Sequence, residues 1–255
     1  MRITFLGTGT SHGIPVIGCQ CAVCLSPNPK NKRNRIGVWV DNGPGASGLI
    51  DVSSEFRIAA IQNGLKHVDF VLLTHTHSDH VSGLDDLRIF SQRSGKGTPI
   101  YSTTETLSDI RDRFAYAFNP TKAYGGGVPQ YELREISSAT DIAGLTVTPL
   151  PILHGPDQIL GFRINNFAFI TDVTTIPDST LELLQGLDIL ALDCLRHEPH
   201  STHLHLEKSI EYALKIKAKQ TYFIHMTHDL EHEETEKSLP PSLKMAYDGL
   251  VLETD

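Results

Sequence analysis

The chain has 255 residues, 40% of them hydrophobic, and a formal net charge of −8. This acidic balance argues against a protein that holds long nucleic acids by neutralising their phosphates, but it allows a small phosphorylated substrate. The sequence shows no run near the ~20 apolar residues of a membrane span and no signal-peptide core, so we expect a cytoplasmic protein without a membrane partner. At this length we expect one domain, residues 1–255.

Short β-rich apolar stretches alternate with helical patterns along the chain. Strands are predicted at 2–6, 36–41, 47–52, 69–73, 98–102, 145–150, 159–164, 167–171, 187–192, 220–224 and 249–253. Helices are predicted at roughly 54–64, 82–93, 104–113, 178–185, 206–217 and 228–237. The first third is mostly strands and later strands alternate with helices, which predicts an α/β fold of two packed mixed β-sheets flanked by helices.

The N-terminal segment contains a glycine motif and a cysteine cluster. Residues 7–11 read Gly-Thr-Gly-Thr-Ser, but His12 stands where a dinucleotide fingerprint needs a third glycine and no βαβ unit follows, so we exclude a nucleotide loop. Cys19, Cys21 and Cys24 fall within six residues, a spacing too tight for an ordinary disulfide framework and suited to one metal ion in a reducing compartment. Tetrahedral zinc needs one more ligand from elsewhere in the chain.

The strongest local signal follows the apolar stretch at 69–73. Residues 74–80 read Thr-His-Thr-His-Ser-Asp-His, and four ligand-capable side chains occupy six positions: His75, His77, Asp79 and His80. If the chain stays extended to residue 77, the first two histidines project to one side, and a turn at Ser78 directs Asp79 and His80 to a second point nearby. Imidazoles with a carboxylate suit divalent ions such as Zn or Mn. The pattern therefore predicts two metal ions.

This pattern resembles the His-x-His-x-Asp-His signature of the metallo-β-lactamase superfamily, whose fold is an αββα sandwich. The resemblance implies three further ligands at later strand ends: His154 after the stretch at 145–151, Asp172 in Phe-Ile-Thr-Asp at 169–172, and His225 after Tyr-Phe-Ile at 222–224. It implies that one metal is held by His75, His77 and His154, and the other by Asp79, His80 and His225. Asp172 is then shared by both ions.

The chain is also similar to a narrower family over nearly its whole length, typified by the phosphodiesterase of the bacterial carbon–phosphorus lyase pathway. Besides the ligands, the similarity rests on the cysteine cluster, on residues 144–151 and on Tyr-Asp-Gly at 247–249. His228, three residues after His225, is the best fourth ligand for a structural zinc at the three clustered cysteines. Cys194 competes for that place, but it lies in an apolar run and is expected to be a buried thiol.

The position of a late histidine implies a catalytic residue. In that family a histidine precedes a late helix by a few residues, and His203 occupies this place here. The resemblance assigns His203 to phosphate binding or to proton donation to the leaving group, with Asp79 as the other catalytic residue. His205 stands where Ser, Thr or Asp would cap the helix, and His197 and His200 are also near in sequence, so these three remain alternatives to His203.

Three acidic residues and one aromatic segment have more than one interpretation. Asp51 either orients a ligand histidine or is a strand-end turn residue, and Asp85 and Asp86 carry similar alternatives. In residues 114–135, aromatics precede a glycine triplet. This segment is a packed surface loop, a lid over the site, or the contact of a homodimer.

Together these features predict a dinuclear-metal-dependent hydrolase. Two divalent ions bring the pKa of a bridging water from ~15.7 towards ~7, and the hydroxide attacks small phosphodiesters, cyclic ones included, while His203 assists the leaving group. A lactone or thioester hydrolase remains an alternative because the same hydroxide attacks carbonyl carbon. A tRNA-processing nuclease is disfavoured by the acidic charge and by the lack of a long insert. A non-hydrolytic scaffold, like the relative in pyrroloquinoline quinone synthesis, is disfavoured because all seven dinuclear ligands are present.

Overall fold

The first of two β-sheets combines the N-terminal half of the chain with its last strand. The computed structural model describes residues 1–118 and 127–254. In these residues the first sheet has the order β14-β1-β2-β3-β4-β5-β6. Its strands are β1 (Arg2–Gly7), β2 (Gly37–Asp41), β3 (Ser47–Ile50), β4 (Phe70–Leu72), β5 (Thr98–Ser102), β6 (Tyr131–Glu135) and β14 (Val251–Glu253). Strands β3 to β6 run parallel, so their carboxyl ends meet at one edge of the sheet.

The second sheet contains the remaining described strands, in the order β13-β12-β11-β10-β9-β8-β7. They are β7 (Thr140–Ile142), β8 (Leu145–His154), β9 (Asp157–Ile164), β10 (Phe167–Ile170), β11 (Ile189–Asp193), β12 (Gln220–Ile224) and β13 (Leu243–Met245). Strands β10 to β13 are parallel, whereas β7 to β10 pair antiparallel. The sheet is therefore mixed, with a second parallel edge.

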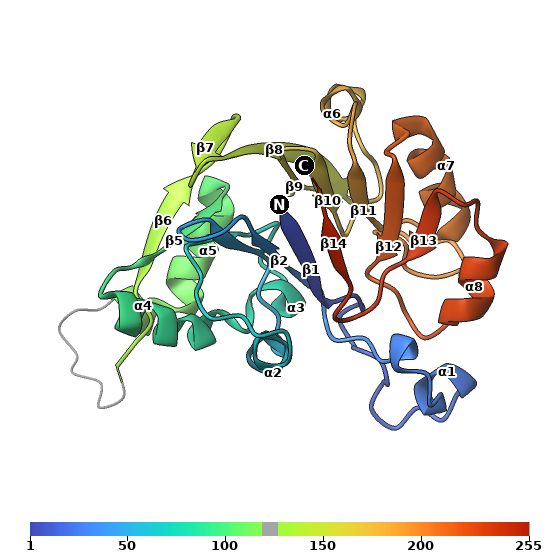
Figure 1. Ribbon diagram of the computed structural model, residues 1–255, viewed down its shortest axis with the longest axis horizontal. Helices are drawn as coiled ribbons and strands as arrows, with labels where there is room; N and C mark the ends of the chain where they lie inside the picture. The colour runs from blue at the N-terminus through green and yellow to red at the C-terminus, as the bar shows by residue number, and fades with distance from the viewer. Residues whose placement is uncertain (119–126, 255) are drawn as a thin grey trace.

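Helices cover the outer faces of both sheets, as Figure 1 shows for α4 and α5 on one side and α7 and α8 on the other. The α-helices are α1 (Ala22–Leu25), α2 (Phe56–Gln62), α3 (Ser78–Val81), α4 (Arg88–Ser94), α5 (Thr104–Arg113), α6 (Asp178–Leu183), α7 (Leu206–Ile216) and α8 (His232–Ser238). Short 3₁₀ turns are η1 (Pro29–Asn31), η2 (Leu84–Leu87) and η3 (Ala115–Phe118). No helix among the described residues is long and apolar enough to cross a membrane.

The buried apolar side chains form three layers that explain this arrangement. Between the sheets, Phe5 and Leu72 of the first sheet pack in one cluster with Phe162 and Phe167 of the second. A second cluster joins α2, α4 and α5 to the outer face of the first sheet, and a third joins α6 and α7 to the outer face of the second. The prediction of two packed mixed sheets flanked by helices is confirmed.

The elements that the sequence patterns miss are short or lie at sheet edges. Strands β6, β7 and β13 stand at the ends of the two sheets and were not predicted. An edge strand is covered on fewer sides, so its sequence lacks the apolar run of a central strand, as Tyr-Glu-Leu-Arg-Glu in β6 illustrates. The predicted helix at 82–93 is instead the turn η2 followed by α4, and the helix predicted from residue 228 begins at His232.

The glycines at the end of β1 let the backbone pack closely against residues 33–35. A Cβ atom on Gly7 would lie 1.9 Å from the carbonyl oxygen of Arg35, and one on Gly9 would lie 2.9 Å from the Cβ of Arg33. Only a residue without a side chain permits such close backbone approach. Gly9 forms parallel bridges with both Arg35 and Met226, so the motif joins the first sheet to the end of β12. The exclusion of a nucleotide loop is consistent with this structural role.

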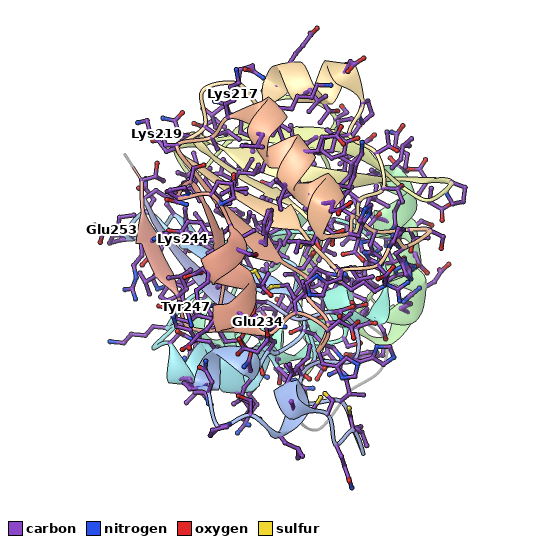
Figure 2. All side chains as sticks on the ribbon, turned by 90° about the vertical axis from the view of Figure 1, so that its right-hand side faces the viewer. Lys217, Lys219, Glu234, Lys244, Tyr247 and Glu253 are labelled. Atoms are coloured by element: carbon purple, nitrogen blue, oxygen red, sulfur yellow. The ribbon has the colours of Figure 1, made fainter. Side chains whose placement is uncertain are left out.

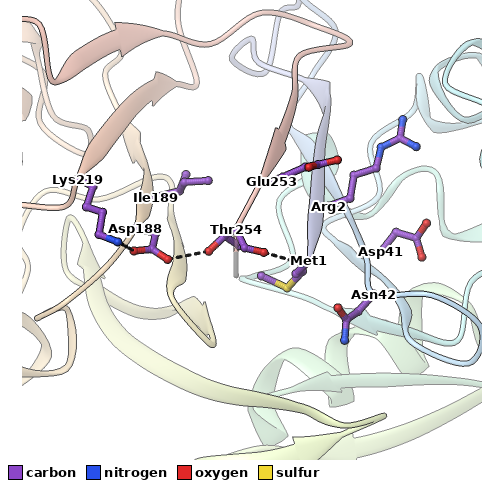
Figure 3. Close-up of a pocket in the computed structure, with 9 residues that line it drawn as sticks. All are labelled: Met1, Arg2, Asp41, Asn42, Asp188, Ile189, Lys219, Glu253 and Thr254. Carbon is purple, nitrogen blue, oxygen red and sulfur yellow. Dashed lines mark hydrogen bonds and ion pairs between the residues drawn. The ribbon is translucent and has the colours of Figure 1, made fainter.

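At the opposite end of the sandwich, the two chain ends meet the second sheet, as Figure 3 shows. The Met1 amine donates a 2.6 Å hydrogen bond to the carbonyl oxygen of Thr254, whose hydroxyl donates to Asp188 at 2.9 Å. Asp188 also pairs with Lys219 at 2.7 Å. Lys217, the residue after α7, has a left-handed backbone conformation, and Figure 2 shows Lys219 close to it. Met1, Asp188, Lys219 and Thr254 line part of a pocket of about 650 Å³, and none of the predicted ligands lines it.

Candidate dinuclear metal site and cysteine site

The predicted ligands converge because the parallel strands of both sheets end at the same edge of the sandwich. Residues that follow or end these strands are Asp51 after β3, His75 to His80 after β4, His154 at the end of β8, Asp172 after β10, Asp193 at the end of β11, and His225 after β12. Ligand sites of α/β folds form at the carboxyl ends of strands in this way. Asp51, Asp172 and His225 adopt positive φ angles of 58°, 55° and 60°. Such strained backbone clusters at functional sites.

Two groups of side chains match the two predicted metal positions. The ligand atoms of His75, His77, His154 and Asp172 all lie within 4.8 Å of one another, and so do those of Asp79, His80 and His225. All of these side chains are buried except that of His77, which is exposed. The structure thus brings together all seven residues that the resemblance implied.

Asp172 is placed to serve both positions. Its Oδ1 lies 3.9 Å from Nε2 of His75, whereas its Oδ2 lies 3.3 Å from Nε2 of both His80 and His225. In the second group, Oδ2 of Asp79 lies 3.4 Å from the same nitrogen of His80 and 3.5 Å from that of His225. Ligand atoms about 2.0–2.1 Å from a tetrahedral ion are about 3.3 Å apart, so this spacing fits a divalent ion.

Unpaired buried nitrogens give a second test of this fit. The Nε2 atoms of His75, His80 and His225 are buried and make no hydrogen bond with the described residues. A buried polar atom without a partner is costly, and a metal ion would satisfy each of these nitrogens. The donor set of imidazoles and carboxylates fits two divalent ions.

The electrostatics of the site favour a positive charge among the ligands. Burial opposes ionisation of Asp172, but the neighbouring His225 and His80 hold the pKa of its carboxyl well below the usual value. Burial likewise opposes protonation of His80, yet the charges of Asp172 and Asp51 raise its pKa well above the usual value. In contrast, burial and then His80 lower the pKa of His75. Cationic charge is therefore stabilised beside the carboxylates, where metal ions would supply it.

Asp51 orients one of the ligand histidines. Its Oδ2 lies 2.7 Å from Nδ1 of His80, and both side chains are fully buried. The backbone N–H of Thr74 donates to Oδ1 of Asp51 at 2.9 Å, and the Thr74 hydroxyl donates to Oδ2 at 2.8 Å. Of the two interpretations of Asp51, the structure favours the orienting one. Asp85, in contrast, pairs with Arg88 and accepts a hydrogen bond from Tyr116.

His203, which the resemblance assigned a catalytic role, lies beside the dinuclear group. Its Nε2 lies 3.9 Å from Oδ1 of Asp172, and its ring stacks on that of His225. The His200 ring lies tilted against that of His203, with 5.1 Å between the ring centroids, but His200 is exposed. His205 is the residue before α7 and makes no side-chain capping bond, which agrees with its departure from the usual capping residues.

Asp193 was not predicted from the sequence, yet its carboxylate faces two histidines of the predicted site, His203 and His225. Its Oδ1 lies 3.5 Å from Nδ1 of His225 and 3.6 Å from Nδ1 of His203, while its Oδ2 accepts the Leu204 N–H at 2.9 Å. Asp193 is fully buried. Its position at the end of the apolar strand β11, like that of Asp172 after β10, is the signal that could have found it.

The local geometry around the first motif differs from the expectation in one respect. Strand β4 ends at Leu72, and Ser78 begins the short helix α3 instead of a simple turn. Asp79 and His80 lie on this helix, and the His80 ring still contacts that of His75, with 4.1 Å between the ring centroids. The ligands still form two groups, as predicted, but a helical turn rather than a simple turn places Asp79 and His80. The Ser82 N–H donates to the carbonyl oxygen of Ser78, which closes this turn of helix.

The cysteine cluster forms a separate site with His228. The Sγ atoms of Cys19, Cys21 and Cys24 lie 3.3, 3.5 and 3.3 Å from Nδ1 of His228. This spacing fits tetrahedral zinc, for which sulfur and nitrogen ligands are about 3.5 Å apart. The Cys24 N–H lowers the pKa of the Cys21 thiol to about 7, whereas burial raises the pKa of the Cys24 thiol to about 11. Cys194 is fully buried elsewhere, in the cluster beneath α7, as predicted.

Part of the aromatic segment at 114–135 lies outside the described residues, which omit 119–126. In the described part, Phe114 and Phe118 contact the ring of Tyr131, and the Tyr131 hydroxyl donates to the carbonyl oxygen of Leu84 at 2.9 Å. These contacts belong to a packed aromatic cluster. The lid and the homodimer contact stay predictions.

Comparisons with known proteins agree with this geometry. A family model described as a beta-lactamase superfamily domain matches residues 38–226. A solved structure described as a new diphosphatase from the PhnP family has a TM-score of 0.92 and 41% sequence identity, covering 100% of this chain and 98% of that one. Ribonuclease Z from Mycobacterium bovis is 28% identical over 217 residues, which are 78% of this chain and 71% of the relative.

A longer relative matches over almost the whole chain. An octanoyltransferase from Porphyromonas gingivalis is 38% identical over 256 residues, which cover 98% of this chain but 51% of that protein. The chain thus spans about half the length of this relative. The family match, the sheet topology and the structural similarity agree with one another. The chain therefore belongs to the metallo-β-lactamase superfamily of hydrolases, among its PhnP-like members.

Proposed function

We propose that the chain is a dinuclear-metal phosphodiesterase that acts on small phosphodiesters, cyclic ones included. The observation that carries this proposal is the position of Asp172, whose two carboxylate oxygens face different histidines, with His203 beside it. The metallo-β-lactamase fold implies divalent metal ions, and the ligand set suits Zn or Mn. We assign a structural Zn to the cysteine site.

The residues of the site would have different roles in this reaction. Two divalent ions, when bound, supply Lewis acidity and lower the pKa of water so that a nucleophile exists at neutral pH. Asp79 and Asp172 offset the charge of the dications. Nε2 of His203 faces Oδ1 of Asp172, so it is positioned to donate a proton to the departing oxygen of the substrate. Asp193 faces the other nitrogen of His203 and orients the ring.

The comparisons support phosphoester chemistry over the alternatives. The 41% identical structural neighbour is described as a diphosphatase, and the more distant relatives include ribonuclease Z. The name octanoyltransferase belongs to a protein about twice as long, and we do not transfer it to this chain. A lactone or thioester hydrolase is the second candidate. A non-hydrolytic scaffold requires lost ligands, and all seven ligand side chains are in place.

A substrate panel tests the proposal. Metal-loaded protein is incubated with bis(p-nitrophenyl) phosphate, a cyclic alkyl phosphodiester, a lactone and an acyl thioester. We expect turnover of the two phosphodiesters and loss of that turnover in Asp172→Asn. Asp85→Asn is the matched control, because Asp85 pairs with Arg88 away from the ligands and should retain activity. Turnover of the lactone or thioester without turnover of either phosphodiester would overturn the proposal.

A further inference from the structure

Arg33 is a buried arginine that lies between the two candidate metal sites. Its side chain is 1% exposed, and its guanidinium group donates hydrogen bonds to the carbonyl oxygen of Thr227 at 2.6 Å and to that of Leu230 at 2.7 Å. Burial lowers the pKa of Arg33 to about 10, and the charges of Asp248 and Glu231 oppose that change. A buried charge is costly, so such a residue needs a specific structural role.

The two carbonyl groups belong to a segment that carries one ligand of each site. Thr227 directly precedes His228, the nitrogen ligand of the cysteine site, and Leu230 follows it by two residues. His225 of the dinuclear site lies three residues before His228. A single guanidinium group therefore holds both ends of the turn that contains His228 and begins two residues after His225.

The backbone of the same segment is held on its other side by residues that follow β1. The Met226 N–H donates to the carbonyl oxygen of Thr8 at 3.1 Å, and the Thr10 N–H donates to that of Met226 at 3.2 Å. His225 has a φ angle of 60°, which a residue with a side chain adopts only when its surroundings hold it there. The hydrogen bonds at Met226 and Thr227 provide this restraint from the residues that follow His225.

Arg33 is also attached to the cysteine lobe. Its backbone exchanges two 2.8 Å hydrogen bonds with Ile14, and Ile14 packs in one apolar cluster with Cys24. The next residue before it, Lys32, donates from Nζ to the carbonyl oxygen of Cys24 at 2.9 Å. The Arg33 segment thus contacts the cysteine loop through its backbone and the His225 to Leu230 segment through its side chain.

We propose that Arg33 is a positioning residue that couples the cysteine site to the dinuclear site. By fixing the carbonyl oxygens of Thr227 and Leu230, it places His228 and His225 together, so that metal binding at one site favours binding at the other. This inference rests on the proposed metal sites of the preceding section. An arginine is required because its planar fork reaches two carbonyl groups, whereas the single ammonium of lysine cannot hold both in the same geometry.

The test measures metal occupancy in Arg33→Lys. Zinc-loaded protein is titrated with a chromophoric chelator, and the affinity of each equivalent is obtained. Replacing zinc with cobalt identifies the cysteine site by its thiolate charge-transfer absorption. We expect a cooperative melting transition, and a loss of about 10–100-fold in affinity for one equivalent at the dinuclear site, the usual effect of removing a residue that orients a ligand.

The matched control is Arg35→Lys, two residues further along the chain. Arg35 donates hydrogen bonds to Ser11 and Ser54 and pairs with Glu55. These partners lie outside residues 225–230, so the Arg35→Lys variant should bind all equivalents normally. Cys21→Ser completes a double-mutant cycle, and we expect it to weaken the same equivalent in wild type but little further in Arg33→Lys. Additive effects, or an Arg33→Lys variant that binds like Arg35→Lys, would overturn the coupling.

A second measurement covers the case in which Arg33→Lys does not fold. In the Cys21→Ser variant, hydrogen exchange is measured at the amides of Thr10 and Met226, which join the residues after β1 to this segment. Coupling predicts faster exchange than in wild type, and unchanged exchange contradicts it. Both readouts are independent of turnover, so a protein that binds metal in this coupled way but hydrolyses no phosphodiester would refute the proposed function and leave the coupling standing.

Discussion

The rings of His203 and His225 stack with an interplanar angle of 11° and a centroid distance of 4.9 Å. One of these residues is a predicted metal ligand and the other the predicted proton donor. Both turn their Nδ1 atoms towards Asp193 and leave Nε2 to face Asp172. The carboxylate at the end of β11 therefore faces both rings, without a hydrogen bond to either Nδ1 atom. His203, the proposed proton donor, lies beside the dinuclear group without being one of the seven predicted ligands.

His203→Ala should retain both catalytic metals and lose turnover by about 10²–10⁴-fold on an alkyl phosphodiester. The departing alkoxide needs a proton, whereas p-nitrophenolate leaves well without one, so the loss on bis(p-nitrophenyl) phosphate should be much smaller. Steady-state kinetics on both substrates and metal analysis measure these effects. His205→Ala is the control, because the His205 side chain makes no capping bond. Equal losses on both substrates would assign His203 to phosphate binding instead.

Asp51→Asn should weaken metal binding at the position that His80 serves. The carboxylate faces the Thr74 N–H with one oxygen and both the Thr74 hydroxyl and the His80 ring with the other. An amide has an NH₂ group in place of one of these oxygens, so it cannot accept all three bonds, and the ring loses its fixed orientation. We expect the affinity for one equivalent to fall about 10–100-fold. Chelator competition measures it, with Asp85→Asn as a control of equal charge change. Unaltered affinity in Asp51→Asn would return Asp51 to the role of a turn residue.

Cys21→Ser should lower stability before it affects the chemistry. A closed tetrahedral site is inaccessible to substrate, and its binding free energy contributes to folding. In a chain of this size each kcal/mol changes the melting temperature by about 2–4 °C, so calorimetry should show a fall of several degrees or more. Cys194→Ala removes a thiol outside the site and keeps the full metal content. If Cys21→Ser abolished turnover while stability and the other metals stayed unchanged, the structural assignment would be wrong.

His232 should make stability depend on mildly acidic pH. Burial, opposed by Glu236 and reinforced by Lys30, lowers its pKa from 6.5 to about 4. The unfolded chain therefore binds a proton between these values that the folded chain does not, and the free energy of unfolding falls as pH decreases from 6.5 to about 4. Melting curves of His232→Gln should show a shallower pH dependence than wild type. A parallel dependence in both proteins would contradict this account, and His67→Gln is the surface control.

Much of the site could be predicted from the sequence because its chemistry is concentrated in one short motif. Four of the seven ligands lie within six residues, and His154, Asp172 and His225 each follow an apolar strand that the pattern detects. These last three residues were implied by the resemblance to the superfamily, and strands that end at one edge bring them together with the motif. The cysteine loop was predictable for the same reason, since three thiols lie close in sequence.

The supporting residues could not be predicted, because their roles depend on contacts between distant segments. Asp193 looks like a charge at the end of an apolar strand, and Arg33 looks like one of several cations in a polar loop. Only the packing of β1 against the end of β12 shows that Arg33 is fully buried. The edge strands and the short helix α3 were missed because they bury too little apolar surface to leave a periodic pattern.

The measurement that tests the central claim most directly is a metal titration of chelated protein, followed by turnover of bis(p-nitrophenyl) phosphate and by metal analysis. The account predicts three equivalents per chain, with the first filling the thiolate site without activity and full turnover appearing only when two more are bound. Full activity with a single equivalent beyond the thiolate site, or turnover that survives complete chelation, would contradict a dinuclear mechanism at Asp172.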